Sequence, residues 1–450
     1  MMGEKQVEQE ALFYGFSLER HVPDDHLVRS LDRFVDLSGI RAQLKSFYST
    51  TGRPSIDPEL LIRMLIIGYT HGIRSERRLC EEVHLNLAYR WFCRLGLEGD
   101  VPDHSTFSKN RHGRFRDSDL LRHLFEDVVR RCIEEGLVGG VGFAVDASII
   151  KADANRQRSV RSEDGLPPDH STRAVDEYLA TLDDAAFGGS TEVIPKFISL
   201  ADPAARWTGA NRGPAFFAYC TNYLIDVKHA VIMDVEPTAT IRQAETWAQR
   251  AMIDRVIDTY GVYPEKLAGD MGYGSANNLH WLVEERGIEP HIPVFSKAAR
   301  TDGTFNQSEF TYDHAGDAFT CPEGKLLTTR GEPNADHFIT YRATAYDCKV
   351  CPSKARCCPK EPARKLKRHI YEGARDLARD IAKTDAYLVS RRERKKVEMS
   401  FAHLKRILKL DRLRLRGPQG AKDEFLLAAT AQNLRKLAKM IPMSQPVMAG

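Results

Sequence analysis

Apolar positions recur at helical spacing through the first third of the chain. Asp57 followed by Pro58 is typical of a helix start, because an N-cap residue precedes proline at the first helical position. Apolar residues then repeat at three- and four-residue steps, at Leu60, Leu61, Met64 and Leu65. His71-Gly72 ends this helix and Ser75 is placed to cap the next one. An aromatic-rich helix is predicted over residues 87–95.

A further helix, capped by serine and basic in character, is predicted after Pro102-Asp103. It carries Phe107, Lys109, Arg111 and Arg114. Short helices joined by tight turns, the last of them basic, are typical of a helix-turn-helix-like DNA reader. Lys109 and Arg111 are the predicted phosphate contacts in this helix. A plain helical bundle is the alternative that the spacing leaves open.

The pattern changes in the middle of the chain. Residues 141–150 form a compact run with β-branched residues, which predicts a strand, and the polar residues 153–213 predict a long loop. Two strands at 223–227 and 230–235 are joined by a turn at Lys228-His229. A helix at 241–257, a strand at 266–269, a helix at 277–285 and a strand at 291–294 follow. This order predicts an α/β fold built on a mixed sheet.

Regular periodicity is lost between about residues 295 and 385. It returns in a helix over residues 386–410 and in a last helix over residues 423–439. The apolar positions of the last helix are Leu426, Leu427, Leu434 and Leu437.

The length of the chain allows two or three domains, and the distribution of charge distinguishes one segment. The chain has 450 residues, 42% hydrophobic and 28% charged, as in globular proteins. Residues 1–10 are polar and acidic, which predicts no signal peptide, and no apolar run approaches a membrane span, so a cytoplasmic location is expected. The net charge is only +3, but residues 361–420 hold eighteen Lys or Arg against eight Asp or Glu. Such a segment favours a polyanionic partner, and a solvated charged face is the alternative.

Two aspartates occupy positions where a carboxylate needs an explanation. Asp146 lies inside an apolar run, where a carboxylate is costly to bury unless it is paired or metal-bound. Asp270 ends a predicted strand, and the neighbouring Gly269 and Gly272 allow a sharp turn. The carboxyl end of a sheet strand is a frequent place for an α/β active site. For either aspartate taken alone, a capping or turn-forming role is the favoured alternative.

A third carboxylate, Glu398, lies in the helix predicted over residues 386–410. The apolar stripe of this helix consists of Val397, Phe401, Leu404 and Leu408. Arg391, Arg394, Glu398 and Lys405 lie together on the adjoining face. An ordinary amphipathic surface helix with an i,i+4 ion pair is the alternative.

Five of the nine cysteines fall in one short segment, namely Cys321, Cys348, Cys351, Cys357 and Cys358. A cytosolic chain keeps its thiols reduced, so the clustering favours a metal over disulfides. The spacing of Cys348 and Cys351 is that of a zinc knuckle, and the other three offer further ligands. A second Cys-x2-Cys pair is missing. The segment therefore predicts a structural zinc, with reduced cysteines in a small packed subdomain as the alternative. The isolated His104, His229 and His403 favour core or surface roles over metal ligation.

Taken together, these residues resemble those of a known family. Arg394-x3-Glu398-x6-Lys405 resembles the Tyr-x2-Arg-x3-Glu-x6-Lys signature of one branch of the bacterial insertion-sequence DDE transposases, although Arg391 stands at the position of the tyrosine. The segments 145–148 and 269–274 resemble those that carry the family's first and second aspartates. Residues 102–107 resemble the helical domain found in many members, and the Cys-rich segment resembles an insertion of one subgroup. The resemblance covers about residues 10–440.

The resemblance implies an α/β fold with an RNase H-like catalytic core. It implies a helical DNA-binding domain at residues 1–130, the first part of the core at 131–295, a Cys-rich insertion at 296–385 and the C-terminal helices of the core at 386–440. Asp146, Asp270 and Glu398 are then the catalytic residues and the ligands of two Mg²⁺ ions, which Mn²⁺ replaces in some enzymes. Arg394 and Lys405 are implied to hold DNA phosphates.

The implied function is DNA transposition. The enzyme would cleave double-stranded DNA at the terminal inverted repeats of an insertion sequence and join the ends to target DNA, by metal-dependent phosphoryl transfer. Pairing of two element ends favours a homodimer on DNA, and no membrane partner is expected. A nuclease of the same fold that cuts without joining is one alternative, and a DNA-binding protein without catalysis is another. The presence of all three carboxylates disfavours the latter.

Overall fold

The computed structural model describes residues 15–52, 54–189, 194–209, 213–294 and 302–442, so residues 1–10 and the start of the predicted 296–385 insertion lie outside the described residues. The chain forms two compact units. The first comprises Met1–Gly139, Ala147–Gly261 and Lys396–Gly450, and the second comprises Gly140–Asp146 and Val262–Lys395. The predicted domains at 1–130, 131–295, 296–385 and 386–440 stay a prediction. Within the described ranges, no helix is both long and apolar enough to cross a membrane.

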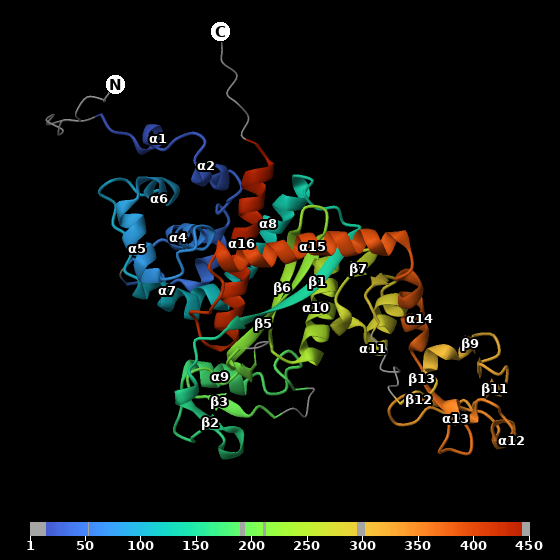
Figure 1. Cartoon of the computed structure of the whole chain (residues 1–450). Coiled ribbons are helices and arrows are strands. Elements are labelled where there is room, and N and C mark those ends of the chain that lie inside the picture. Colours follow the sequence, from blue (N-terminus) through green and yellow to red (C-terminus); the bar gives the residue numbers. More distant parts are fainter. Residues whose placement is uncertain (1–14, 53, 190–193, 210–212, 295–301, 443–450) are drawn as a thin grey trace, which may run out of the picture. The chain divides into compact units, whose positions relative to one another are not determined.

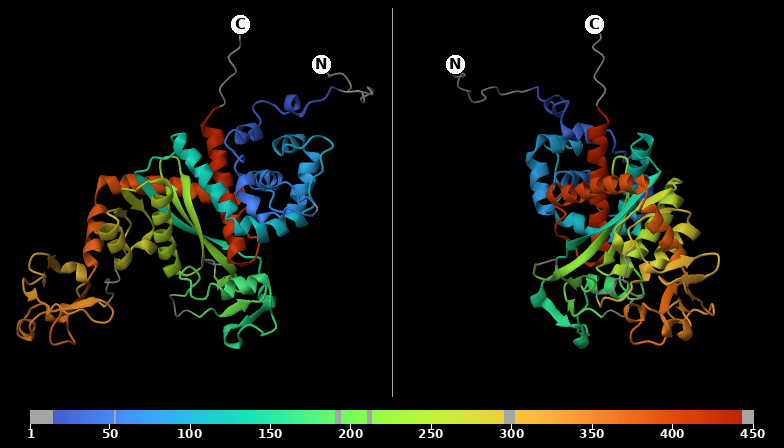
Figure 2. Two further views of the ribbon diagram at one scale, coloured as in Figure 1. Left: turned by 180° about the vertical axis from the view of Figure 1, so that it is seen from behind. Right: turned by 45° about the vertical axis from the view of Figure 1, so that its right-hand side comes forward.

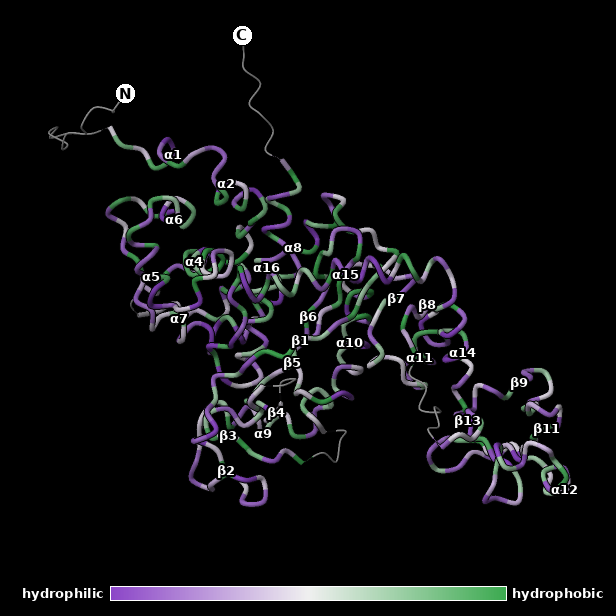
Figure 3. The backbone as a smooth tube through the Cα atoms, in the orientation of Figure 1, coloured by the Kyte–Doolittle hydropathy of each residue, from purple (hydrophilic) through white to green (hydrophobic). Residues whose placement is uncertain are grey.

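The first unit begins with a series of short helices (Figure 1). They are α1 (Leu18–His21), α2 (Leu27–Asp32), α3 (Ile40–Leu44), η1 (Lys45–Phe47), α4 (Pro58–Thr70), α5 (Glu76–Leu85), α6 (Leu87–Phe92), α7 (Ser105–Asn110), η2 (Arg111–Phe115) and α8 (Leu120–Glu134). Two predicted caps are confirmed: the side chain of Asp57 accepts a hydrogen bond from the Glu59 N–H, and that of Ser75 accepts one from the Arg78 N–H. The helix α4 is mostly buried and is hydrophobic along much of its length (Figure 3).

The predicted serine cap of α7 is wrong. His104 is the N-cap residue, and it makes no side-chain capping bond. The Asp103 carboxylate instead accepts a hydrogen bond from the Ser105 N–H at 2.8 Å. Asp103 therefore begins the turn one residue before the cap, as an aspartate can when its side chain bonds to the backbone two residues later.

The long strands confirm the predicted sheet. They are β1 (Gly142–Lys151), β5 (Phe216–Asp226) and β6 (Val231–Ala239). β5 and β6 pair antiparallel, and the residues between them form the predicted turn at Lys228-His229. β1 lies next to β5. The predicted helix at 241–257 is α10 (Arg242–Tyr260), which packs on β5 and β6.

Residues 153–213 are not the continuous loop that their composition predicted. Their described part contains η3 (Arg156–Arg158), β2 (Ser159–Arg161), η4 (Ser162–Asp164), α9 (Arg173–Leu179), β3 (Phe197–Ser199) and β4 (Arg206–Thr208). β2 pairs with β3, and β4 pairs with β5. Strands of three residues are too short to show a period, and the partner of β2 lies far along the chain, so a local pattern does not reveal them.

The last helix, α16 (Gly417–Met440), includes the predicted helix at 423–439 and begins earlier. It packs against α4, α8 and β6 within the first unit (Figure 2). The Asn433 side chain bonds to both backbone groups of Ile232, accepting from N at 3.0 Å and donating to O at 2.8 Å. Arg74 forms a buried ion pair with Glu424. The N-terminal helices and the C-terminal helix therefore share one core.

The second unit contains a parallel arrangement of β1, β7 (Lys266–Ala268) and β8 (Glu289–His291). β8 begins two residues before the strand predicted at 291–294, and only His291 of that stretch is in the strand. The predicted helix at 277–285 is present as α11 (Ala276–His280) followed by η6 (Trp281–Glu285).

The stretch without sequence periodicity also contains regular elements. They are η7 (Gln307–Glu309), β9 (Thr311–Asp313), β10 (Ala318–Thr320), β11 (Leu326–Leu327), β12 (Phe338–Arg342), α12 (Ala345–Lys349), α13 (Lys354–Cys357), β13 (Lys365–His369) and α14 (Glu372–Ile381). β9, β10 and β11 form one small sheet, and β12 pairs with β13. The predicted helix at 386–410 is α15 (Asp385–Arg406), which continues from the second unit into the first.

Candidate active site

Asp146 lies on β1, and Asp270 lies two residues past the end of the neighbouring strand β7. β1 and β7 are parallel, and each paired residue of β7 lies 124 positions after its partner in β1. Asp146 and Asp270 have the same offset, although the pairing itself ends at Ala144 and Ala268. A Cβ added to Gly269 would lie only 3.2 Å from Val145 Cγ1, so the two chains stay close beyond the last pair. The two aspartates therefore follow the paired residues of β1 and β7 at corresponding positions.

The backbone after β7 orients the Asp270 carboxylate. Asp270 is the N-cap of η5 (Met271–Tyr273), and its Oδ1 accepts a hydrogen bond from the Gly272 N–H at 2.6 Å. A Cβ at position 272 would lie 2.7 Å from the same oxygen, so glycine permits this close approach. Within the described ranges, no other hydrogen bond to this carboxylate is found. One of its oxygens is thus fixed by the backbone, and the other is available as a ligand.

Asp146 lies where β1 leaves the core. Phe143, Ala144 and Val145 are buried, and exposure first rises at Asp146, which is half-buried. An ionised carboxylate at this boundary keeps access to a cationic partner that a fully buried position would deny it.

The N-terminal part of α15 approaches β7 within the second unit. Arg394 donates a hydrogen bond from Nη1 to the Gly269 carbonyl at 3.3 Å, directly before Asp270. Its Nε is buried and has no hydrogen-bond partner in the described part of the chain. Glu393 lies 4.0 Å from the Lys266 ammonium group. The structure thus sets a guanidinium, predicted to hold phosphate, beside the second aspartate.

The C-terminal part of α15 belongs to the first unit. Its apolar stripe is confirmed, because Val397, Leu404 and Leu408 are buried. The Glu398 side chain is exposed. Lys405 Nζ lies 3.5 Å from the Ile149 carbonyl, and partial burial lowers the pKa of its ammonium group. Lys405 is therefore tied to β1, three residues beyond Asp146.

The described residues contain no group of three or more His, Cys, Asp or Glu side chains gathered to hold a metal ion. The convergence of Asp146, Asp270 and Glu398 therefore stays a prediction. The five clustered cysteines are free thiols.

Comparison with known families identifies two parts of the chain. Residues 16–113 match the family described as Transposase domain (DUF772), and residues 320–438 match the family described as Transposase DDE domain. The chain belongs to the insertion-sequence DDE transposases. No solved structure matches it. The second match includes Glu398 and all five clustered cysteines of the transposase, and it does not reach Asp146 or Asp270.

Arg111 and Lys109 occupy different environments in the helical region of the transposase. Arg111 is 3% exposed, and its guanidinium pairs with Glu76 at 2.5 Å. Burial of this kind removes Arg111 from the protein surface, so the structure corrects its prediction as a phosphate contact. Lys109 is exposed.

Lys109 lines an open recess of about 500 Å³. The recess is lined by Pro54, Ser55, Ile56, Thr106, Lys109, Asn110, Gly113 and Arg114. Arg114 stacks on Tyr48 at 4.2 Å and donates a hydrogen bond to Asn110 Oδ1 at 3.1 Å. The sequence analysis gave Arg114 no role. Arg114 lies five positions after Lys109, and in a regular helix that spacing does not put the two side chains on one face. The non-helical backbone at Gly113 changes that spacing and leaves no sequence signal beyond the glycine itself.

The basic segment 361–420 is not a single positive face. Several of its cations are neutralised locally, since Arg368, Arg375 and Arg379 pair with acidic residues of α14, and Arg412 and Arg416 pair with Asp153. In the described ranges no ion pair is found for five exposed residues of α15, Arg391, Arg392, Lys395, Lys396 and Arg406, or for the exposed Lys367, Lys409 and Arg414. Most of the positive charge that this segment offers to a polyanion therefore lies on α15.

The three histidines set aside as ligands have other surroundings. His104 is exposed and lies 3.3 Å from the Asp103 carboxylate. His229 is half-buried at the turn between β5 and β6. His403 bonds through Nδ1 to the Gln432 side chain at 2.5 Å, and burial lowers the pKa of its ring.

Proposed function

We propose that this transposase cleaves DNA at the ends of an insertion sequence and joins those ends to target DNA, using Asp146, Asp270 and Glu398 in an RNase H-like core. The observation that carries the proposal is the corresponding placement of Asp146 on β1 and Asp270 just past the end of the neighbouring parallel strand β7, with Arg394 bonded to the backbone between β7 and Asp270. Carboxylates from separate elements are what a two-metal phosphoryl-transfer site requires.

The residues fit hard divalent cations. All three proposed ligands are carboxylates, and Mg²⁺ prefers oxygen ligands, with Mn²⁺ as a substitute. The backbone bond to one Asp270 oxygen leaves the other oxygen for a cation. Glu398 follows Arg394 by one turn of the same helix, so it projects from a neighbouring position on α15. When bound, the cations stabilise charge on the attacking and leaving oxygens of the displacement.

The basic residues of α15 supply the phosphate contacts in this proposal. Arg394 is held by the Gly269 carbonyl, and Lys405 is held by the Ile149 carbonyl. A guanidinium that is already oriented loses little conformational freedom when it binds a phosphate, and its planar donors match phosphate oxygens. These two side chains would position the scissile phosphate and balance its charge, which phosphoryl transfer requires more than covalent help.

Lys109 and Arg114 contribute DNA affinity from the recess in the helical region. Basic side chains at an open recess suit the phosphate backbone, and such contacts make binding strongly dependent on salt. We further propose that the transposase acts as a homodimer, because joining needs two element ends. Membership of the Tyr-Arg-Glu-Lys branch is also part of this proposal, because Arg391 stands where the signature of that branch has tyrosine.

The two aspartates are tested by isosteric substitution in the full chain. Asp146→Asn and Asp270→Asn should each lower Mg²⁺-dependent nicking of element-end DNA by at least about 100-fold, because loss of a ligand costs more than loss of an outer contact. Asp258→Asn on α10 is the matched control, since its carboxylate is exposed, and nicking should be unchanged.

The same assay separates the alternatives. Supplying a second DNA as target should yield joined products with the unmodified chain. Nicking without joining would identify a nuclease, and binding without nicking would identify a DNA-binding protein. Nicking by Asp270→Asn at the rate of Asp258→Asn would refute the role of Asp270.

A further inference from the structure

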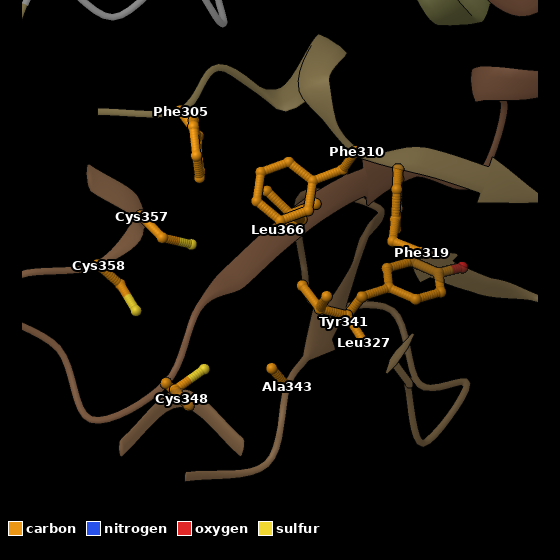
Figure 4. Packing of buried hydrophobic residues seen from close by; sticks show 11 residues of the cluster. Phe305, Phe310, Phe319, Leu327, Tyr341, Ala343, Cys348, Cys357, Cys358 and Leu366 are labelled. Carbon is orange, nitrogen blue, oxygen red and sulfur yellow. The ribbon is translucent and has the colours of Figure 1, made fainter. Parts of the chain in front are cut away.

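All five clustered cysteines line a single small cavity in the second unit. The cavity has a volume of about 20 Å³, the size of one ion or water molecule, and its lining includes Cys321, Cys348, Cys351, Cys357 and Cys358. Figure 4 shows that the sulfurs of Cys348, Cys357 and Cys358 turn toward the same space. Residues separated by up to 37 positions in the sequence are thus gathered by the fold around one point.

The cysteines come from separate local elements. Cys321 follows β10 in the turn to β11, Cys348 lies in α12, Cys351 lies between α12 and α13, and Cys357 ends α13. Ligands that approach from several turns can surround an ion, whereas ligands from one helix face cannot. This arrangement is the one a tetrahedral site requires.

Hydrogen-bond donors already point at two of the sulfurs. The Lys325 N–H donates to Cys321 Sγ at 3.3 Å. The Lys354 ammonium group donates to Cys358 Sγ at 3.4 Å. Nitrogen donors at such distances can hydrogen-bond to the sulfur of a metal-bound cysteine, as outer groups commonly do at metal sites.

The hydrophobic core around the cysteines is small for the number of short strands and helices that pack on it. Its buried cluster consists of Phe305, Phe310, Phe319, Leu327, Tyr341, Ala343, Cys348, Cys357, Cys358, Ala363 and Leu366. Three of these are the cysteines themselves, and the strands around them have two to five residues. Small modules with so little core usually depend on disulfides or a structural metal. The cysteines here are free thiols.

We infer that this cavity holds one structural Zn²⁺, bound by Cys321, Cys348, Cys351 and one member of the adjacent pair Cys357 and Cys358. Four thiolates are a common ligand set for structural zinc, with Zn–S distances of about 2.3 Å. The described side chains do not form a closed metal site, so binding requires some cysteines to change rotamer about the Cα–Cβ bond. The site is separate from the carboxylates proposed for catalysis.

Zinc content of the full chain tests the inference. Elemental analysis after expression with added zinc should find about one zinc per chain. Blocking the thiols with an organomercurial should release that zinc, as read by a chromogenic chelator. X-ray absorption should show four sulfur ligands. A zinc-free protein whose five thiols all react rapidly, or a zinc bound by nitrogen and oxygen, would overturn it.

Substitutions identify the ligands. Cys351→Ser should lower the zinc content at least tenfold, whereas Cys80→Ser, outside the cluster on α5, should retain it. Only one of Cys357→Ser and Cys358→Ser should lose zinc. Full zinc content in Cys351→Ser would contradict the proposed ligand set. If Cys351→Ser does not fold, the organomercurial release and the absorption spectrum of the unmodified chain still decide.

Discussion

Asp423 in α16 is a carboxylate held in an unfavourable environment. It is 9% exposed, and burial raises the pKa of its carboxyl group to about 6 despite the nearby Arg111 and Arg116. Its Oδ2 is buried and has no hydrogen-bond partner in the part of the chain that the structure describes. The folded state therefore binds a proton here more tightly than the unfolded state, whose carboxyl group has its ordinary pKa near 3.8.

Removing this charge should stabilise the transposase at neutral pH. The favourable contribution of the protonated carboxyl group is complete below about pH 4 and is lost as the pH rises through about 6. Asp423→Asn, which is always neutral, should therefore raise Tm relative to the unmodified chain more at pH 7.5 than at pH 4.5. Expressed as free energy of unfolding, the stabilisation by Asp423→Asn should be larger at pH 7.5 than at pH 4.5 by on the order of 2–3 kcal/mol. Calorimetry at the two pH values measures it, with Asp258→Asn as the control. An equal Tm change at both values would show that Asp423 is not perturbed.

Asp146 and Asp270 were singled out because a carboxylate in or after an apolar strand needs a reason, and their catalytic role stays a prediction. Arg111 was misjudged, because the sequence of its own helix does not show the acidic partner, Glu76, that α5 supplies. An amphipathic pattern identifies a polar residue, but not whether a distant element will bury it.

Lys109 in α7 and Arg111 in η2 are neighbouring basic residues with different expected roles, DNA binding for Lys109 and stability for Arg111. Arg111→Ala removes the partner of a partly buried Glu76 and should lower the free energy of unfolding by on the order of 3 kcal/mol. Lys109→Ala should change stability by less than about 0.5 kcal/mol, because its side chain is exposed. It should weaken binding to any DNA sequence and reduce the slope of log affinity against log salt by about 1.

Denaturation and gel-shift titrations at several salt concentrations separate these effects. The two variants serve as controls for each other, since they lie two positions apart. A Lys109→Ala chain with unchanged affinity and salt slope would remove the recess from the DNA interface. A stable Arg111→Ala chain would show that the Glu76 pair contributes little.

Long elements were predicted from sequence, and short paired elements were not. α4, α10, α15 and α16 each run through several turns, and β5 and β6 are long enough to show their pairing. The sequence analysis missed α14 although its buried Ala374 and Ala378 recur at helical spacing. Its charged residues form ion pairs among Glu372, Asp376, Arg375 and Arg379. The short strands of residues 302–371 have two to five residues each, which is too few to show a period.

In the molecule as a whole, each of the two units is built from segments that are far apart in the sequence. α16, from the C-terminal end, packs against α4 and α8 from the N-terminal third, so the helical region is part of a larger core. A sequence read in order predicts consecutive domains, and it gives no sign that a last helix returns to the first ones. The family comparison follows the same order, with the transposase domain at 16–113 and the DDE domain at 320–438.

Glu398 is proposed to complete a catalytic site with Asp146 and Asp270. The most direct test compares Glu398→Gln with Glu284→Gln, the same change at an exposed glutamate of η6, in a Mg²⁺-dependent nicking assay on DNA that both variants bind. Glu398→Gln keeps the size of the side chain and removes the charge that holds a cation, so nicking should fall by at least about 100-fold with DNA affinity nearly unchanged. Glu284→Gln should nick at nearly the unmodified rate. Equal nicking rates for the two variants would contradict the claim and leave Glu398 as an exposed residue of an amphipathic helix.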